Sequence, residues 1–266
     1  MKKIFLTGAS AGIGLASAKA LIEEGYEVWG TSRYPERLPQ LKNFHPVRLD
    51  LRDAQQTTSA FAEAAEEAGG FDVVINNAGS GHFGPAELLS ATETADQFQV
   101  LFFAQVRLLQ LALEHMRPRN RGLIINVTSL ASRLPVPFMG AYNAAKAALA
   151  SFIFTMQLEL GHSGVRLVDL QPADINTGFN DGVAKGKEDT RYAAAVTKTW
   201  DTVERNMKEA PGPAIIARTI VSLLDDENPP PRVTAGGFFQ AQIAPAIFRV
   251  LPQRVRVWGL KLYYGL

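Results

Sequence analysis

The segment TGASAGIG, residues 7–14, decides the fold of this chain. It follows a short apolar stretch, KIFL at residues 3–6, and leads into the amphipathic pattern IGLASAKALIEEG, where Gly25 is placed to end a helix. Glycines at positions 8, 12 and 14 suit a tight turn that brings the backbone close to a pyrophosphate at a helix N-terminus. Ser17 stands where the third glycine of the usual G-x-G-x-x-G would fall, so this turn alone indicates either a nucleotide site or a simple connection.

Strand-like and helix-like stretches alternate outward from this segment. Apolar runs recur at residues 26–32, 45–51, 71–79, 121–129 and 164–172, separated by helical patterns of ten or more residues. This alternation predicts an α/β fold with one doubly wound parallel sheet and helices on both faces. The triple proline at 229–231 divides a main domain, residues 1–228, from a C-terminal extension, residues 229–266, which we expect to pack on the same domain.

The composition excludes several function classes. With 266 residues, 47% hydrophobic and 20% charged, the chain is long enough to bury a large core. Its 27 basic residues are interspersed with 26 acidic ones for a net charge of +1, which argues against a nucleic-acid partner. Cysteine is absent, so disulfides and thiolate zinc sites are excluded, and no metal site is expected. The amino-terminal apolar run is too short for a signal peptide or a membrane span, which predicts a cytoplasmic protein.

A second motif, AYNAAKAAL at residues 141–149, places Tyr142 and Lys146 on one face of an alanine-rich helix. The pair is either an ordinary helix-surface pair or a proton-transfer device in which the ammonium lowers the pKa of the phenol. Two further signals lie at strand ends: NNAG at 76–79, and Ser129 after the buried strand. Together with T-G-x-x-x-G-x-G at the amino terminus, these motifs resemble the short-chain dehydrogenase/reductase family over about residues 3–227.

The resemblance implies a Rossmann-type domain, a nicotinamide cofactor, and Ser129, Tyr142 and Lys146 as the catalytic group. A carbonyl that accepts a hydride needs a proton donor within hydrogen-bond reach, which would be Tyr142. Ser129 would bind the substrate oxygen and Lys146 the nicotinamide ribose, and Lys146 together with the positive ring of the oxidised cofactor would lower the pKa of the tyrosine by roughly 2 units. The cofactor positions implied by the motifs are Gly8, Ser10, Gly12, Ile13, Gly14, Ser32, Arg33, Asp50, Leu51, Asn77, Ala78, Gly79, Tyr142, Lys146, Pro172, Ile175 and Thr177.

The end of the second strand bears on which nicotinamide cofactor is bound. A carboxylate there would bind the free ribose hydroxyls of NAD, but Ser32 occupies this position and Arg33 follows it. A guanidinium can bond a 2′-phosphate, and Ser32 or Ser10 could add a neutral hydrogen bond. We therefore expect NADP(H), with a solvent-facing Arg33 as the alternative. Asp50 resembles an adenine-side position, although it could instead cap the following helix.

Two positions depart from the family pattern. Many members carry an asparagine in the middle of the fourth helix, thought to hold a water that links the lysine to solvent, and Leu101 stands there in this chain. Gln97 and Gln105 lie one turn to either side and could take over that role, or they could be surface or interface residues. Ala173 replaces the glycine that usually follows the proline, and it should be tolerated if its φ is negative.

The region between the last strand pattern and residue 213 varies most within the family, and we expect a substrate lid at about 174–213. Apolar residues are expected to line the site: Phe83, Leu130, Leu134, Phe138, Met139 and Phe179. They favour a hydrophobic ketone or secondary alcohol as substrate. The alternatives are an NAD-dependent alcohol dehydrogenase of the same fold and a catalytically silent nucleotide-sensing protein.

Two features of the sequence predict binding partners. The helical patterns at 96–116 and 141–160 carry apolar residues on more than one face, and we expect a homodimer or homotetramer. The C-terminal extension contains five basic residues and no acidic one, mixed with aromatic residues, and resembles loosely the steroid- and retinol-dehydrogenase-like branch. We expect it to cover the substrate cleft or a subunit contact, with peripheral contact to an anionic membrane as the alternative.

Overall fold

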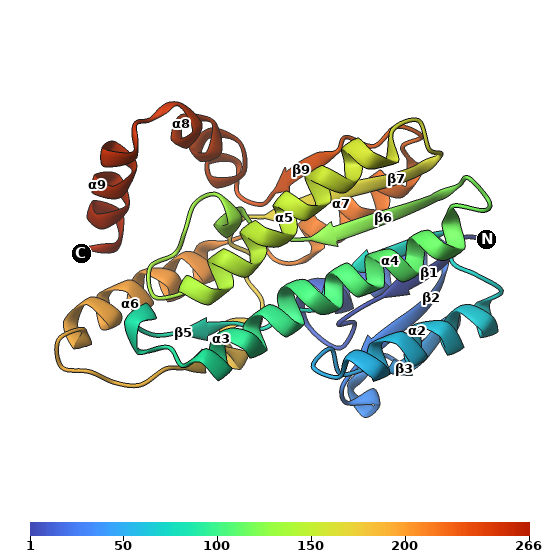
Figure 1. Ribbon diagram of the computed structural model, residues 1–266, viewed down its shortest axis with the longest axis horizontal. Coiled ribbons are helices and arrows are strands. Elements are labelled where there is room, and N and C mark those ends of the chain that lie inside the picture. Colours follow the sequence, from blue (N-terminus) through green and yellow to red (C-terminus); the bar gives the residue numbers. More distant parts are fainter.

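A parallel sheet of seven strands, in the order β3-β2-β1-β4-β6-β7-β9, forms the centre of the computed structural model, which describes residues 1–266 (Figure 1). Its strands are β1 (Lys3–Leu6), β2 (Glu27–Ser32), β3 (Phe44–Arg48), β4 (Val73–Asn76), β6 (Gly122–Val127), β7 (Val165–Pro172) and β9 (Arg232–Ala235). The sheet is parallel throughout. The predicted α/β fold with a doubly wound parallel sheet is confirmed.

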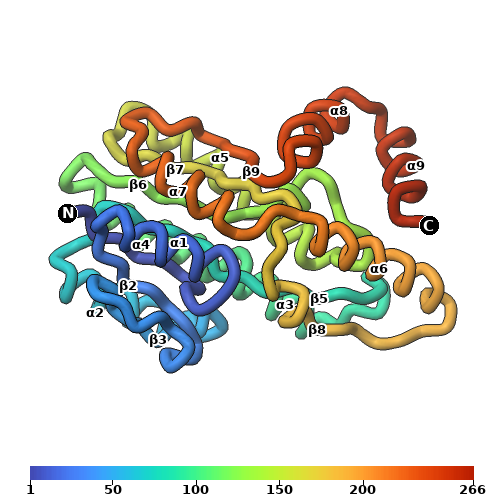
Figure 2. The backbone as a smooth tube through the Cα atoms, turned by 180° about the vertical axis from the view of Figure 1, so that it is seen from behind, coloured from blue at the N-terminus to red at the C-terminus, as the bar shows by residue number.

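Helices cover both faces of the sheet (Figures 1 and 2). They are α1 (Gly12–Glu23), α2 (Ala54–Ala68), α3 (Ala91–Phe98), α4 (Ala104–Met116), α5 (Gly140–Leu160), α6 (Ala193–Glu209), α7 (Ala214–Asp225), α8 (Ala244–Val250) and α9 (Gln253–Tyr264). Successive residues of β1 point to opposite faces: Phe5 joins the core formed with α2, α4 and α5, whereas Ile4 and Leu6 join the core formed with α1 and α7. Buried apolar side chains on both faces stabilise the sheet between two helical layers.

The strand order reverses between β1 and β4, which lie side by side at the centre of the sheet. From β1 the chain continues to β2, on one side of the sheet's centre, and from β4 it continues to β6, on the other side. In an open parallel sheet such a reversal opens a crevice beyond the carboxyl ends of the strands. The two glycine-bearing motifs, after β1 and after β4, therefore meet at the edge of the sheet where such a crevice is expected.

The predicted lid region begins with a short irregular segment and ends after α6. Its strand β8 (Ala184–Lys185) pairs with β5 (His82–Phe83) in a small second sheet. Beyond β9, the helices α8 and α9 extend past the main sheet, and α9 contacts α6 (Figure 1). There Asn206 donates a hydrogen bond of 2.8 Å to the Tyr263 hydroxyl. The C-terminal extension therefore links β9, the strand at one edge of the sheet, to helix α6 of the lid region.

Much of the C-terminal extension is apolar and open to solvent. Its exposed large side chains include Phe238, Phe239, Ile247, Val250, Trp258 and Leu262. Tyr264, by contrast, is buried. None of the helices in the molecule is both long enough and apolar enough to pass through a membrane.

Candidate active site

The turn after β1 requires glycine at three positions. Gly8 and Gly12 have φ angles of +72° and +53°, in the left-handed region that other residues rarely adopt. A Cβ atom on Gly14 would lie 2.0 Å from the Gly8 carbonyl oxygen, so no larger residue fits. Helix α1 begins at Gly12 with no side-chain cap and no acidic residue in its first turn, which leaves its N–H groups free for an anion. This cradle fits the pyrophosphate of a dinucleotide.

The residues after β4 hold this turn in place. Asn77 donates from Nδ2 to the carbonyls of Thr7, at 2.9 Å, and Gly8, at 3.4 Å. In return, the Thr7 hydroxyl accepts from the backbone N–H groups of Asn77 and Ala78 at 2.9 and 3.0 Å. Thr177, which follows β7, closes the other side, because a Cβ on Gly12 would lie 3.4 Å from its Cβ. The structure therefore brings the motifs after β1, β4 and β7 together around one crevice.

The end of β2 presents two guanidinium groups. Ser32 is buried and its hydroxyl accepts from the backbone N–H of Tyr34 at 3.1 Å, while Arg33 is exposed. The guanidinium carbons of Arg33 and Arg37 lie 5.6 and 4.8 Å from the centre of the Tyr34 ring. Neither arginine belongs to an ion pair. Arg37 could not be predicted from the sequence, because the short 3₁₀ helix Pro35–Arg37 is what brings it to the same ring as Arg33.

Asp50, after β3, does not cap the following helix. Its carboxylate accepts from the backbone N–H of Arg52 at 3.1 Å, and the cap of α2 is Asp53, which accepts from the N–H of Gln56 at 2.9 Å. The alternative reading of Asp50 as a helix cap is therefore wrong, because the helix begins one turn later than that reading required. Next to it, Leu51 is buried and its carbonyl accepts from the side chain of Gln99.

The three candidate catalytic side chains come from the end of β6 and the start of α5. Ser129 has an extended backbone and its hydroxyl accepts from the N–H of Ala131 at 3.1 Å. Tyr142 lies in the first turn of α5 and is half-buried, and Lys146 follows one turn later with 4% of its surface exposed. The Lys146 ammonium donates to the Val127 carbonyl at 2.8 Å, which ties α5 to the end of β6.

Burial dominates the electrostatics of this group. It lowers the pKa of Lys146 to about 8, against the opposing charge of Asp169. It also raises the pKa of Tyr142; a hydrogen bond with Ser129 opposes this rise, and the charge of Asp174 adds to it. In the protein alone the pKa of the phenol is therefore governed mainly by burial, and its expected lowering by Lys146 together with the oxidised nicotinamide stays a prediction.

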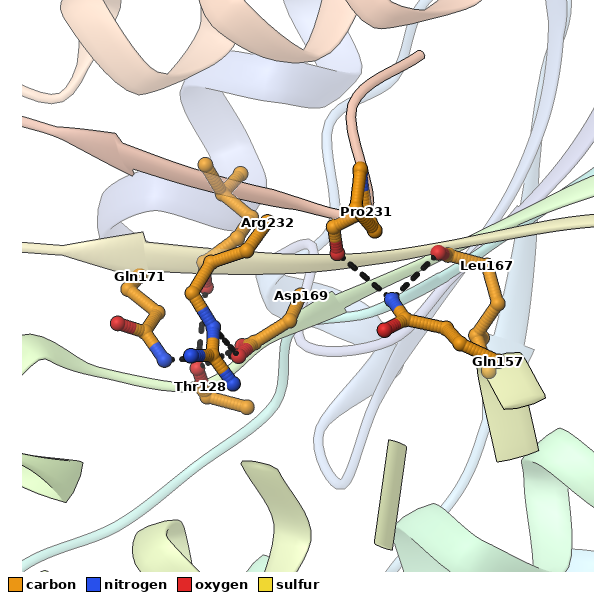
Figure 3. Close-up of polar contacts among 8 residues, drawn as sticks. Thr128, Gln157, Leu167, Asp169, Gln171, Pro231 and Arg232 are labelled. Atoms are coloured by element: carbon orange, nitrogen blue, oxygen red, sulfur yellow. Dashed lines mark hydrogen bonds and ion pairs between the residues drawn. The ribbon is translucent and has the colours of Figure 1, made fainter. Parts of the chain in front are cut away.

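A polar network supports the strands behind the catalytic group (Figure 3). Asp169 on β7 is 1% exposed and accepts hydrogen bonds from Thr128, from Gln171 at 2.7 Å and from Arg232 at 2.8 Å. Below it in the sheet, the side chain of Gln157 on α5 donates to the carbonyls of Leu167 and Pro231. A buried carboxylate is tolerated when it is paired, and Arg232 is the cation that pairs with this one.

Leu101, the departure noted in the fourth helix, lies in a π-helical turn at Gln99–Phe103 that joins α3 to α4. Leu101 is fully buried. Gln105 is 1% exposed and its amide donates to the carbonyls of Ala78, at 2.9 Å, and Val100, at 3.2 Å. Gln97 is buried as well and donates to Ser80. The interpretation of both glutamines as surface or interface residues is wrong, because both are buried and donate to residues that follow β4.

Apolar side chains form a cluster beside Tyr142. Phe83, Met139 and Val183 are buried in it, and Phe138, Phe179 and Trp200 pack against them. The ring centres of Tyr142 and Phe179 are 5.9 Å apart. Of the other expected lining residues, Leu130 is buried and Leu134 is half-buried in the segment after Ser129. The φ angle of Ala173, after β7, is not positive, which is the condition under which alanine can replace the glycine.

Comparison with known proteins agrees with this arrangement. The family model of the short chain dehydrogenases matches residues 2–188. The chain belongs to the short-chain dehydrogenase family. It is an oxidoreductase of a family that uses nicotinamide cofactors, and the predicted resemblance is confirmed.

Three proteins that are similar to this chain are informative. The chain is 31% identical to a 3-ketodihydrosphingosine reductase of Bacteroides thetaiotaomicron, over 99% of this chain and 98% of that protein. It is similar to the crystal structure of a short-chain dehydrogenase from Streptomyces avermitilis, with a TM-score of 0.83, 28% identity and coverage of 99% and 96%. It is also similar to an alcohol dehydrogenase from Thermococcus sibiricus complexed with 5-hydroxy-NADP, with a TM-score of 0.74, 25% identity and coverage of 90% and 97%.

Proposed function

We propose that the protein is an NADP(H)-dependent reductase that interconverts a hydrophobic ketone and the corresponding secondary alcohol. The observation that carries this proposal is the joining of a glycine cradle to the group Ser129, Tyr142 and Lys146 at one edge of the sheet. When bound, the nicotinamide supplies or accepts the hydride. The protein's part is then to hold the carbonyl and move one proton at its oxygen.

Each catalytic side chain has a separate task in this reaction. Tyr142 donates its hydroxyl proton to the substrate oxygen, and burial keeps the phenol protonated because it raises the pKa. Ser129 binds the same oxygen and orients it. Lys146, held by the Val127 carbonyl, binds the ribose of the cofactor and stabilises the phenolate that remains after proton transfer.

The preference for NADP(H) is supported by charge at the end of β2. No carboxylate lies at residues 31–34 to bind free ribose hydroxyls or repel a phosphate. Arg33 and Arg37 are exposed, and no acidic residue competes for them. The similar Thermococcus protein was solved with an NADP derivative, which agrees with this preference.

The apolar cluster beside Tyr142 supports a hydrophobic substrate. Aromatic and aliphatic side chains there offer a surface for an alkyl chain but few hydrogen-bonding groups for a sugar. The name of the Bacteroides relative describes the reduction of a keto compound, 3-ketodihydrosphingosine. We propose that the C-terminal extension covers this cleft, since Tyr263 bonds to α6.

We also propose a homo-oligomer built through α4 and α5. Phe103, at the start of α4, and Phe154 and Leu158, on α5, are 56%, 56% and 69% exposed. Large apolar side chains at such exposure on neighbouring helices are typical of a contact between subunits.

A panel of alkyl ketones and secondary alcohols, incubated with NADPH, NADH or the oxidised cofactors, tests the proposal. Absorbance of the reduced nicotinamide should change with NADPH and ketones that carry an alkyl chain. Turnover with NADH but not with NADPH would instead favour an NAD-dependent alcohol dehydrogenase. Cofactor binding by calorimetry without turnover of any compound would favour a nucleotide-sensing protein.

A further inference from the structure

Asp174 is a carboxylate next to the catalytic tyrosine that has no cation to pair with. It lies two residues after the end of β7, beside the strand that leads to Ser129, because Thr128 donates to the carbonyl of Leu170. Its charge acts on the phenols of both Tyr142 and Tyr264. Asp174 therefore lies between the catalytic group and the C-terminal extension.

The side chains that form hydrogen bonds with Asp174 are neutral. The side chain of Gln240, in the π-helical turn Phe239–Ile243, donates to Oδ2 of Asp174 at 2.8 Å. The amide of Asn206 on α6 also interacts with the carboxylate, and burial raises the pKa of Asp174 against these two hydrogen bonds. No ion pair includes Asp174, and no nearby lysine or arginine lowers its pKa.

The contrast with Asp169 shows what is missing. Asp169, five residues earlier in the chain, is 1% exposed and is paired with Arg232, whereas Asp174 is half-buried and belongs to no ion pair. A carboxylate withdrawn from water without such a partner is costly. If Asp174 served only to tie Gln240 and Asn206 together, an asparagine would make comparable hydrogen bonds without that cost. The carboxylate of Asp174 is therefore free to pair with a cation that arrives with a ligand.

Building on the proposed function, we propose that Asp174 binds a protonated amine of the substrate, so that the substrate class is a long-chain amino ketone. The ketone oxygen is held by Tyr142 and Ser129, so a group that reaches Asp174 lies within a few bonds of the reacting carbon. The alkyl chain then lies on the apolar cluster around Phe83 and Phe179. Asp174 fixes which side of the ketone carries the amine and which carries the chain.

The binding contribution of this contact follows from its chemistry. An ammonium that donates to a half-buried carboxylate forms a charge-assisted hydrogen bond, which corresponds to about ten- to a hundredfold in affinity. The gain is specific, because an alcohol or a methylene in the same place leaves Asp174 without its cation.

The test compares a long-chain α-amino ketone with the same ketone lacking the amine, both with NADPH. The wild-type ratio of kcat/KM should favour the amino ketone at least tenfold, and Asp174→Asn should bring that ratio to about one. Asp181→Asn, which neutralises an exposed carboxylate of the same segment, should leave the ratio as in wild type. A wild-type ratio near one, with the plain ketone reduced, would overturn the amine site and leave the reductase assignment intact. Absence of turnover of both ketones would overturn both.

A binding measurement on the wild-type protein tests the amine site without turnover and without a variant that must fold. A long-chain alkyl amine should raise the Tm of the wild-type protein with NADP⁺ more than the alkyl alcohol of equal length. Equal shifts would contradict the amine site. Where Asp174→Asn folds, it should remove the difference between the two compounds.

Discussion

Replacing Arg33 and Arg37 by alanine tests how the protein selects its cofactor. Both guanidiniums are exposed and free of ion pairs, so a 2′-phosphate would not have to displace a carboxylate. A charge-assisted bond to phosphate is worth about 1.5 to 3 kcal/mol, and leaving the Tyr34 ring costs about 0.5 to 1 kcal/mol. The net gain of about 1 to 2 kcal/mol per arginine corresponds to roughly five- to thirtyfold in affinity.

The assay is fluorescence titration of NADPH and NADH at one ionic strength. Each single variant should weaken NADPH by the stated factor and leave NADH nearly unchanged, and the double variant should weaken NADPH by about thirtyfold or more. Arg218→Ala, which removes an exposed arginine of α7, is the matched control for lost charge. Equal affinity of the wild type for the two cofactors, or equal weakening of both by the variants, would refute the role of this arginine pair.

Three further predictions concern chemistry, fold and assembly. Reduction should be independent of pH below about 8 and fall above it, because Lys146 loses its proton there while the raised pKa of Tyr142 keeps the phenol protonated; a rate that rises through pH 8 would contradict this. Gly14→Ala should lower the free energy of unfolding by about 3 kcal/mol or more and prevent cofactor binding, because its Cβ meets the Gly8 carbonyl. Gly212→Ala, which has open space around it, is the control and should change neither the thermal unfolding nor the cofactor titration. Phe154→Asp together with Leu158→Asp should convert an oligomer to monomers in light scattering, and a wild-type protein that is already monomeric at micromolar concentration would rule out the proposed contact.

The parallel sheet and its two helical layers could be predicted from the sequence because they depend on local periodicity. Apolar runs alternating with helical patterns leave few arrangements other than a parallel sheet with two helical layers. The positions Gly8, Gly12 and Gly14 could be predicted for a similar reason, since the turn that needs them lies within eight consecutive residues.

What could not be predicted depends on contacts between distant residues and on burial. Asp174 meets Gln240 across 66 positions of the chain, so its lack of a cation is visible only once the extension is placed. Gln105 is buried just after a π turn, and helical periodicity does not reveal such a turn. The pKa of Tyr142 depends on how much water the fold removes from it, whereas the sequence showed only the neighbouring ammonium.

The catalytic role of Tyr142 is tested most directly by Tyr142→Phe, which removes the hydroxyl and keeps the ring that packs on Phe179. The measurement is kcat for reduction of an alkyl ketone, together with the Kd for NADPH. Because general acids contribute typically a hundredfold or more, kcat should fall by at least about a hundredfold while the Kd changes little. A variant that retains more than about a tenth of the wild-type kcat would show that another group supplies the proton and that the assignment of Tyr142 is wrong.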